Sequence, residues 1–226
     1  MNMKYFLLTW VAVLLSTSTL ALDYLPSRGV YNVVVKSYQE QLFGDVLRQK
    51  YDFSCGSAAL ASLLSYHYQT PSNEETIFTV MFDKGDQERI KQEGFSLLDM
   101  KQYLEGIGFD ADGFQLSTTK IKKVGVPGIT LVNFDGYMHF VLVKGINSEH
   151  VIIGDPSRGT VKMRVEDFNR YYQGIILLIK NHAEKGKASF IFDDSFAIYT
   201  PSPVNSAVAR DSLGIFSTTL RESGEN

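Results

Sequence analysis

The feature that most constrains the fold is a largely apolar segment over residues 55–68. It contains no proline, and its one glycine lies at its start, so nothing within it would break a helix. Ser54 directly precedes it and is a residue type that caps helix starts. Apolar side chains lie nearly all round such a helix, which is then buried in the centre of a domain. The sequence therefore predicts a central buried helix that begins at Cys55.

Further helices are predicted downstream of this one. Residues 72–75 (Ser-Asn-Glu-Glu) have the pattern of a capping box and predict a second helix that runs to about Met81. Residues 96–99 (Ser-Leu-Leu-Asp) have a similar pattern and predict a third helix that ends near Gly106. Residues 118–123 predict a short fourth helix.

The second half of the chain consists of short β-rich runs separated by turn residues. These runs are Gly128 to Phe134, His139 to Ile146, His150 to Gly154, Thr160 to Arg164 and Gly174 to Ile179. Residues 165–172, between the last two runs, have a helical pattern. Because helices come first and short strands with tight turns follow, the predicted fold class is α+β with an antiparallel sheet.

The first 21 residues have the pattern of a signal peptide. Lys4 supplies the charged start, an apolar stretch follows to Leu15, and small residues end at Ala21. The apolar stretch is short for a bilayer span, which takes about 20 apolar residues. We therefore expect a mature chain that begins near Leu22, lies in the periplasm and has no membrane span. The alternative is an N-terminal anchor that is not cleaved.

The remaining chain divides into three segments. Residues 22–35 are expected as a lead-in, with a strand-like run over residues 30–36. Residues 36–180 carry the helix and strand patterns and are expected as the folded domain. Residues 181–226 lose these patterns and include Pro201, Pro203 and many serines and threonines, so we expect a loosely ordered C-terminal extension.

Composition excludes several classes of function. The chain has 226 residues and a net charge of −3, so a nucleic-acid partner is not expected. Its single cysteine excludes an internal disulfide framework and a cysteine-rich zinc site. No two histidines have metal-ligand spacing, so no metal or cofactor is expected. An unpaired thiol in an exported protein risks oxidation, so Cys55 is expected to have a function.

Cys55 is the candidate nucleophile. At the start of a helix, free N–H groups and the positive end of the helix dipole favour the thiolate. Gln49 lies six residues earlier, and its side-chain amide could form an oxyanion hole with the Cys55 backbone N–H. The alternatives are that Cys55 is a small buried apolar residue and that Gln49 is an ordinary surface residue.

His139 is the candidate base, because it begins a strand and could there meet another element. The alternative is a hydrogen-bonded structural histidine. His67 is a poorer candidate because it lies about 18 Å further along the Cys55 helix, at 1.5 Å per residue. His150 opens a turn, and His182 lies in the segment that lacks a pattern.

Asp155 is the candidate residue for orienting His139. If residues 147–149 form a three-residue turn, Ile146 lies opposite His150 and Asp155 lies opposite Val141. Val141 shares a face with His139, so Asp155 becomes the diagonal neighbour of His139 and could hold its ring. A two-residue turn would put Asp155 on the opposite face. The alternative is that Asp155 serves only the Asp-Pro turn.

Together these residues supply a nucleophile, a base, an orienting residue and an oxyanion donor. The segment from Gln49 to Leu60 resembles the opening motif of the bacteriocin-processing, papain-like cysteine peptidases that cut double-glycine leaders. Residues 139–143 are similar to the histidine motif of this family, and Asp155 with Pro156 to its aspartate motif. The resemblance covers roughly residues 36–180.

The resemblance implies a papain-like α+β fold in which the helix of Cys55 packs on an antiparallel sheet. It implies that Cys55 is the nucleophile, His139 the base, Asp155 its orienting residue and Gln49 part of the oxyanion hole. The chain lacks the Gly-x-x-x-x-Gly-Lys-Ser/Thr loop of the exporters that carry such domains, so we do not expect an exporter. As a small exported protein, it is similar to the peptidase-like component of bacterial functional-amyloid (Fap-type) secretion systems.

The expected function is that of an exported cysteine endopeptidase. Its expected partner is a polypeptide, such as an amyloid subunit or another secretion-system protein. The alternative is a catalytically silent module that binds a peptide and assists secretion without cutting it. In a third, structural interpretation Cys55 belongs to the core and Asp155 to a turn.

Overall fold

The computed structural model describes residues 37–51, 53–192 and 196. The predicted signal peptide, the lead-in with its strand-like run, and most of the C-terminal extension lie outside these residues. Within the described residues, no helix is long and apolar enough to cross a membrane.

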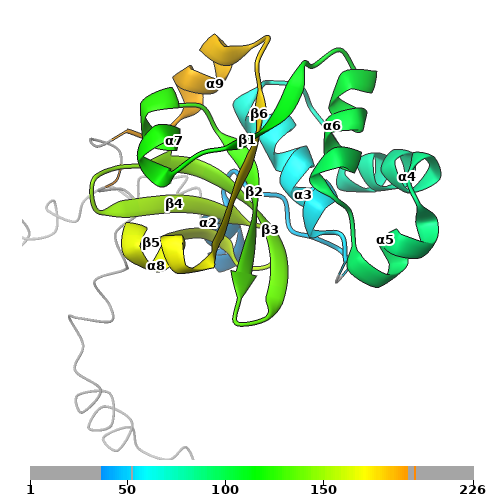
Figure 1. Cartoon of the computed structure of the whole chain (residues 1–226), viewed down its shortest axis with the longest axis horizontal. Coiled ribbons are helices and arrows are strands. Elements are labelled where there is room, and N and C mark those ends of the chain that lie inside the picture. The colour runs from blue at the N-terminus through cyan, green and yellow to red at the C-terminus, as the bar shows by residue number, and fades with distance from the viewer. Residues whose placement is uncertain (1–36, 52, 193–195, 197–226) are drawn as a thin grey trace, which may run out of the picture. The chain divides into compact units, whose positions relative to one another are not determined.

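A six-stranded antiparallel sheet forms the centre of the described part (Figure 1). Its strands are β1 (Ala111–Gln115), β2 (Gly128–Phe134), β3 (Tyr137–Ile146), β4 (His150–Asp155), β5 (Gly159–Arg164) and β6 (Tyr172–Ile179), in the spatial order β1-β6-β2-β3-β4-β5. The five predicted strands are confirmed, and β2 has the predicted bounds. The edge strand β1 was not predicted, because its five residues include Asp112 and Gly113, which are uncommon in strands.

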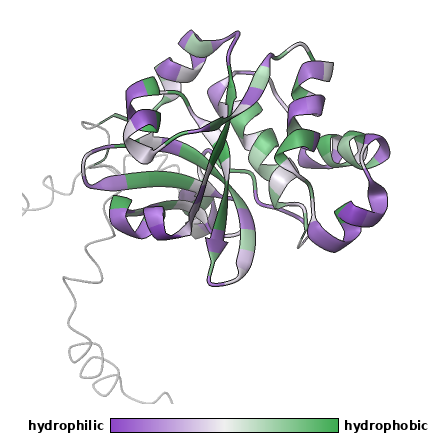
Figure 2. Ribbon diagram, viewed as in Figure 1, coloured by the Kyte–Doolittle hydropathy of each residue, from purple (hydrophilic) through white to green (hydrophobic). Residues whose placement is uncertain are grey.

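Four helices and a π-helical turn lie together beside one face of the sheet (Figure 1). They are α3 (Cys55–Ser62), its continuation η1 (Leu63–His67), α4 (Glu74–Lys84), α5 (Gln87–Glu93) and α6 (Leu97–Gly106). The predicted buried helix is α3, in which every residue after Cys55 is buried. Figure 2 shows α5 as largely hydrophilic, which explains why no apolar pattern predicted it.

The helix starts differ in part from the prediction. The capping box at Ser96 is confirmed, since its side chain and that of Asp99 bond each other's backbone N–H groups. At α4 the cap is Asn73 and not Ser72, because the Asn73 side chain accepts a hydrogen bond from the backbone N–H of Glu75. The Ser72 hydroxyl instead donates to the Thr70 carbonyl.

Two more helices, α7 (Thr118–Val124) and α8 (Val165–Tyr171), cover the other face of the sheet. The alternation along β3 shows the two faces. Phe140 and Leu142 join the apolar core that includes α3, whereas Val141 and Val143 join a second core that includes Phe168 of α8. Figure 2 shows the hydrophobic central strands between these helical layers. The sheet is therefore buried on both sides.

The short helix α2 (Tyr38–Phe43) packs beside β5.

The hairpin between β3 and β4 has a longer turn than predicted. Ile146 pairs with Val151 and not with His150, so the three-residue turn is wrong. Between Val143 and Gly145 the register shifts by one residue at a bulge, and Leu142 then pairs with Gly154. The predicted register is thus present at the end of the hairpin that carries Asp155.

The start of the predicted C-terminal extension is folded. Helix α9 (Ala183–Ser189) packs on η1, and the Ile191 N–H donates to the Lys144 carbonyl at 2.9 Å, beside an isolated parallel bridge to Gly145. Phe190 and Phe196 are buried. The prediction of a loosely ordered segment is therefore wrong for these residues. Their apolar side chains are buried against the domain, although α9 itself is short and polar.

Candidate active site

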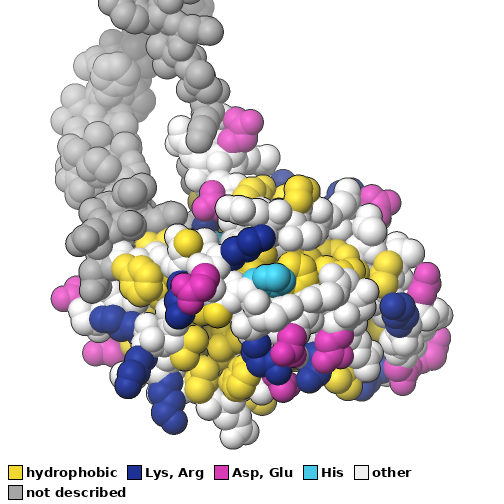
Figure 3. All heavy atoms as spheres, turned by 90° about the horizontal axis from the view of Figure 1, so that it is seen from above, with side chains coloured by type: hydrophobic (Ala, Val, Ile, Leu, Met, Phe, Trp, Pro, Cys, Tyr) yellow, Lys and Arg dark blue, Asp and Glu magenta, His cyan; other side chains and the backbone are white. Residues whose placement is uncertain are grey.

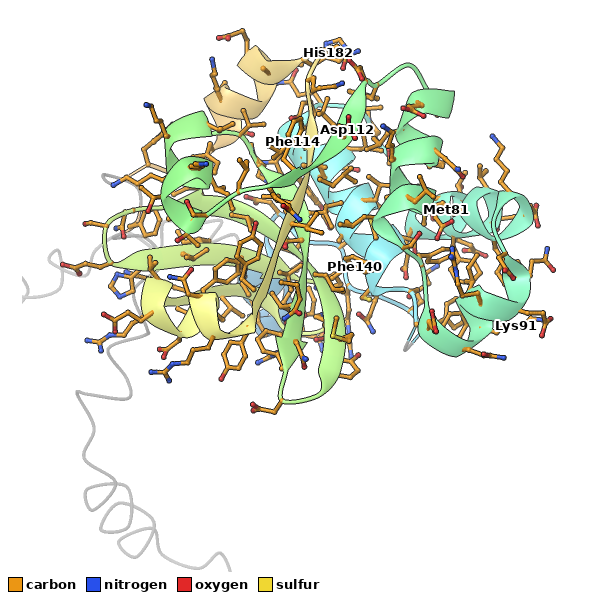
Figure 4. All side chains as sticks on the ribbon, viewed as in Figure 1. Met81, Lys91, Asp112, Phe114, Phe140 and His182 are labelled. Carbon is orange, nitrogen blue, oxygen red and sulfur yellow. The ribbon has the colours of Figure 1, made fainter. Side chains whose placement is uncertain are left out.

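Cys55 is the first residue of α3 and is partly exposed, unlike the buried residues that follow it. The helix approaches the sheet closely at its second residue. A Cβ on Gly56 would lie 2.6 Å from Cε of Met100 and 3.5 Å from the Phe140 ring, so only glycine fits without displacement. Figure 4 shows Phe140 where β3 faces α3.

Cys55 lines a cleft of about 840 Å³. One wall is formed by residues 89–98 of α5, α6 and the link between them, and the other by the β2–β3 hairpin. The side chains of Phe53, Leu131 and Met138 make much of this lining apolar, whereas Arg89 and Glu93 add charge. Such a mainly apolar cleft with a few polar groups is typical of a ligand-binding site.

His139 lies on β3 and is 1% exposed. Its Nε2–H donates to Oδ1 of Asp155 at 2.8 Å, and the Tyr137 ring stacks on the imidazole at 5.5 Å between ring centroids. Its other ring nitrogen, Nδ1, is buried and makes no hydrogen bond within the described part of the chain. The carboxylate thus fixes one tautomer and leaves Nδ1 to take a proton.

The charges at the site favour a protonated ring. Burial alone would lower the pKa of His139, but the hydrogen bond to Asp155 and the interaction with Cys55 outweigh it and raise the pKa to about 9. Burial would also raise the pKa of Asp155, yet the hydrogen bonds from His139 and Ser157 lower it to about 2. The His139 ring therefore keeps its proton at neutral pH, where the Asp155 carboxylate stabilises the imidazolium.

The turn after β4 surrounds the buried carboxylate of Asp155 with donors. The backbone N–H and hydroxyl of Ser157 lie 2.8 and 2.6 Å from Oδ1, and Nε of Arg158 lies 3.1 Å from Oδ2. The Arg158 guanidinium also stacks over the Phe134 ring, 4.7 Å from its centroid. Sequence reasoning missed Ser157 and Arg158, although their place directly after an Asp-Pro turn was a usable signal.

Gln49 is held between this turn and the loop that leads to Cys55. Its backbone N–H donates to the Pro156 carbonyl at 2.9 Å, and its side-chain Nε2 donates to the Tyr51 carbonyl at 3.1 Å. An amide nitrogen has two protons, so one proton of Nε2 is left for another acceptor. The structure thus joins Gln49 to the segments that carry Asp155 and Cys55.

The three remaining histidines have other surroundings. His67 is buried at the end of η1, where Nδ1 lies 2.9 Å from the Ser189 hydroxyl. Burial, followed by the charge of Lys144, lowers the pKa of His67 to about 4, so its ring is neutral at pH 7. His150 lies near Glu149, and His182 packs edge-on against Phe109. Among the described residues, no group of three or more acidic, histidine or cysteine side chains could hold a metal ion.

Charged and apolar side chains are mixed on the surface seen in Figure 3. Basic and acidic groups alternate there with apolar ones, so the face in view carries no field of a single sign.

A family model and individual related proteins both match this chain. The family described as "Peptidase C39 family" matches residues 44–184. A Pseudomonas aeruginosa protein named "Probable functional amyloid protease FapD" is 35% identical over 173 residues, which cover 76% of each chain. The Lactococcus lactis "Lactococcin-G-processing and transport ATP-binding protein LagD" is 28% identical over 159 residues, covering 69% of this chain and 21% of that one.

Solved structures give the same result. A double glycine motif protease from an AMS/PCAT transporter, solved with its leader peptide, is 33% identical, with a TM-score of 0.51 over 60% of this chain and 89% of that one. The peptidase domain of Streptococcus ComA is 22% identical and has a TM-score of 0.51 over 59% of this chain and 96% of that one. The second match supports the fold alone. The papain-like α+β fold is thus confirmed.

Proposed function

Because this chain belongs to the peptidase C39 family, we propose that it is a cysteine endopeptidase in which Cys55 is the nucleophile and His139 the general base. The observation that carries this proposal is the buried hydrogen bond from Nε2 of His139 to Asp155. Within the described part of the chain, Nδ1 of the same ring makes no hydrogen bond, and the interaction with Cys55 helps to raise the pKa of the ring. The open cleft beside Cys55 gives a polypeptide access to the thiol.

In the proposed reaction His139 holds the proton of Cys55 on Nδ1, and the thiolate attacks the carbonyl carbon of the scissile peptide bond. The C–S bond forms and the carbonyl oxygen takes the negative charge. The imidazolium then protonates the leaving amine as the C–N bond breaks, which leaves a thioester. His139 next takes a proton from water, the resulting hydroxide attacks the thioester, and the released thiolate takes part in the next cycle.

Two donors would stabilise the oxyanion. We propose the backbone N–H of Cys55 and the second proton of Gln49 Nε2, whose first proton is bonded to the Tyr51 carbonyl. Asp155 stays ionised and takes no proton in this scheme. It holds the ring of His139 in one orientation and stabilises the imidazolium.

We further propose that the substrate is an exported protein of a functional-amyloid system and that cleavage takes place in the periplasm. The Pseudomonas aeruginosa relative, similar over three quarters of both chains, is named a probable functional amyloid protease. The signal-peptide pattern of residues 1–21 supports export.

The test uses the full chain expressed in a host that assembles such amyloid fibres. Cys55→Ala, which removes only the sulfur, should stop the size change of the substrate protein, and Cys55→Ser should do the same. His67→Ala serves as a matched control, because it removes a histidine that lies outside the site. If the Cys55→Ala protein supports processing and assembly as well as wild type does, the chain is a peptide-binding module and not a peptidase.

A further inference from the structure

We propose that Glu74, a buried residue of α4, keeps the start of α3 uncapped by binding the hydroxyl of Ser54, and that this leaves the positive end of the helix to the Cys55 thiolate. Glu74 and Ser54 are positioning residues in this view, and the inference rests on the proposed peptidase function. Neither residue takes part in the reaction described above.

The first observation is the direction of the Ser54 side chain. Ser54 is the N-cap residue of α3, but its side chain makes no capping hydrogen bond. A serine at this position normally accepts a hydrogen bond from the second or third N–H of its helix. Here the hydroxyl oxygen instead lies 2.6 Å from Oε1 of Glu74 and 2.9 Å from the Tyr51 carbonyl, and it accepts from the Tyr51 N–H at 3.2 Å. The shorter distance assigns its proton to Glu74.

The second observation is the burial of the acceptor. Glu74 is 5% exposed and Ser54 is fully buried, so a carboxylate here is retained only if it is well bonded. Oε1 of Glu74 also accepts from the backbone N–H of Lys50 at 3.0 Å. Charge-assisted hydrogen bonds of this kind are stronger than the neutral bond that a cap would offer to Ser54.

The consequence concerns the first turn of α3. The leading N–H groups of a helix attract negative charge, and a capping oxygen uses part of that capacity. Because Glu74, together with the Tyr51 backbone, holds the Ser54 hydroxyl, this oxygen does not compete with the sulfur of Cys55, which is the first residue of the same helix. The helix thus lacks one capping hydrogen bond, and its first N–H groups remain available to stabilise the thiolate and the oxyanion.

The same contact anchors the loop between the two proposed donors. The Tyr51 carbonyl accepts both the Ser54 N–H at 3.2 Å and Nε2 of Gln49 at 3.1 Å. Glu74 therefore bonds the loop at Lys50 and at Ser54, one residue after Gln49 and one before Cys55.

The experiment measures the second-order rate of Cys55 alkylation by iodoacetamide between pH 4 and 9, together with the melting temperature. Glu74→Ala leaves the Ser54 hydroxyl with only its contacts to the Tyr51 backbone, so that it can turn to cap α3. This variant should slow alkylation at pH 7 by about 3- to 30-fold, the range of a helix-end charge interaction. Glu74→Gln keeps an acceptor oxygen and should retain most of the rate. Glu75→Ala is the matched control, because it removes an adjacent but exposed carboxylate.

The double variant separates this role from a merely structural one. Ser54→Ala added to Glu74→Ala removes the cap and should restore much of the alkylation rate while the melting temperature falls further. Ser54→Ala alone should react within about threefold of wild type, which keeps the test valid if Glu74→Ala does not fold. The proposal is wrong if Glu74→Ala reacts like wild type, or if either Ser54→Ala protein is as slow as Glu74→Ala.

The outcome for wild type distinguishes this inference from the proposed function. If the wild-type thiol reacts no faster than free cysteine, the peptidase proposal fails and this inference fails with it. If wild type is fast and Glu74→Ala equally fast, only the role of Glu74 is disproved.

Discussion

Oδ1 of Asp155 lies 2.8 Å from Nε2 of His139. The two side chains can meet because β3 contains one extra residue, Lys144, at a bulge in its pairing with β4. At the turn end of the hairpin, Ile146 pairs with Val151, and that register continued without a bulge would place Asp155 opposite Leu142. Leu142 and His139 lie on opposite faces of β3, so the two side chains could not meet. The bulge at Lys144 shifts the register by one residue and places Asp155 on the face of His139.

We expect Asp155→Asn to lower kcat/KM by up to about 10⁴-fold, because a neutral amide neither holds the same tautomer of His139 nor stabilises the imidazolium. The raised pKa of His139 should fall well below 9 with the loss of its largest supporting interaction. The pH profile of peptide cleavage measures both effects. Asp167→Asn, an exchange on the exposed surface of α8, is the control.

Much of the fold could be predicted from local patterns. The buried run after Cys55 and the five β-rich runs are strong signals, because a helix buried on all sides and short strands with tight turns leave few alternatives. The bulge at Lys144 leaves no such signal, because lysine is an ordinary residue at the surface. Here it is 1% exposed and pairs with Asp45, which only tertiary structure could show.

Gln49→Ala should lower kcat by about 10²- to 10³-fold and change KM little, since an oxyanion donor acts only in the transition state. The alkylation rate of Cys55 should stay near that of wild type, because alkylation forms no oxyanion. A parallel loss of both rates would show that Gln49 supports the loop and not the oxyanion. Gln102→Ala, which changes an exposed glutamine of α6 outside the cleft, is the matched control.

The candidate catalytic residues could be predicted more fully than the residues that bond and position them. A lone cysteine at a helix start, a histidine near the start of a strand and an aspartate at the end of the next strand are visible in the sequence because their positions follow from local structure. His139 does not begin β3 as predicted, since the strand starts at Tyr137. Ser157 and Arg158 follow Asp155 in the same turn, so the local sequence held a usable signal for them. Glu74 acts through a distance that depends on how α4 packs beside the start of α3. Ser54 shows the limit most clearly, since it lies at the N-cap as predicted but its hydroxyl points to another helix.

The stability of the protein should fall as the pH rises from about 6.5 to 9. His139 has an ordinary pKa of 6.5 when unfolded and about 9 when folded, so the folded protein holds the proton more tightly. This contribution is complete below pH 6.5 and is lost as the pH passes through 9. Urea unfolding at pH 6, 7.5 and 9 measures it. In His139→Gln the decrease over this window should be smaller, and an equal decrease would assign it to other groups.

Gly145→Ala should destabilise the protein by about 1–3 kcal/mol, the usual cost of overpacking. A Cβ at Gly145 would lie 2.5 Å from the backbone oxygen of Ile191 and 2.6 Å from its Cβ, so residues around Ile191 must move away from β3. Gly113→Ala is the matched control, because there the nearest atom is a side-chain carbon of Ile175 at 3.7 Å. Urea unfolding measures the loss of stability, and limited proteolysis measures how readily the segment around Ile191 is cleaved. We expect early cleavage near Ile191 in Gly145→Ala only, because the parallel bridge to β3 holds this segment on the domain. Equal stability of the two variants would show that the segment after α9 contributes nothing to the fold.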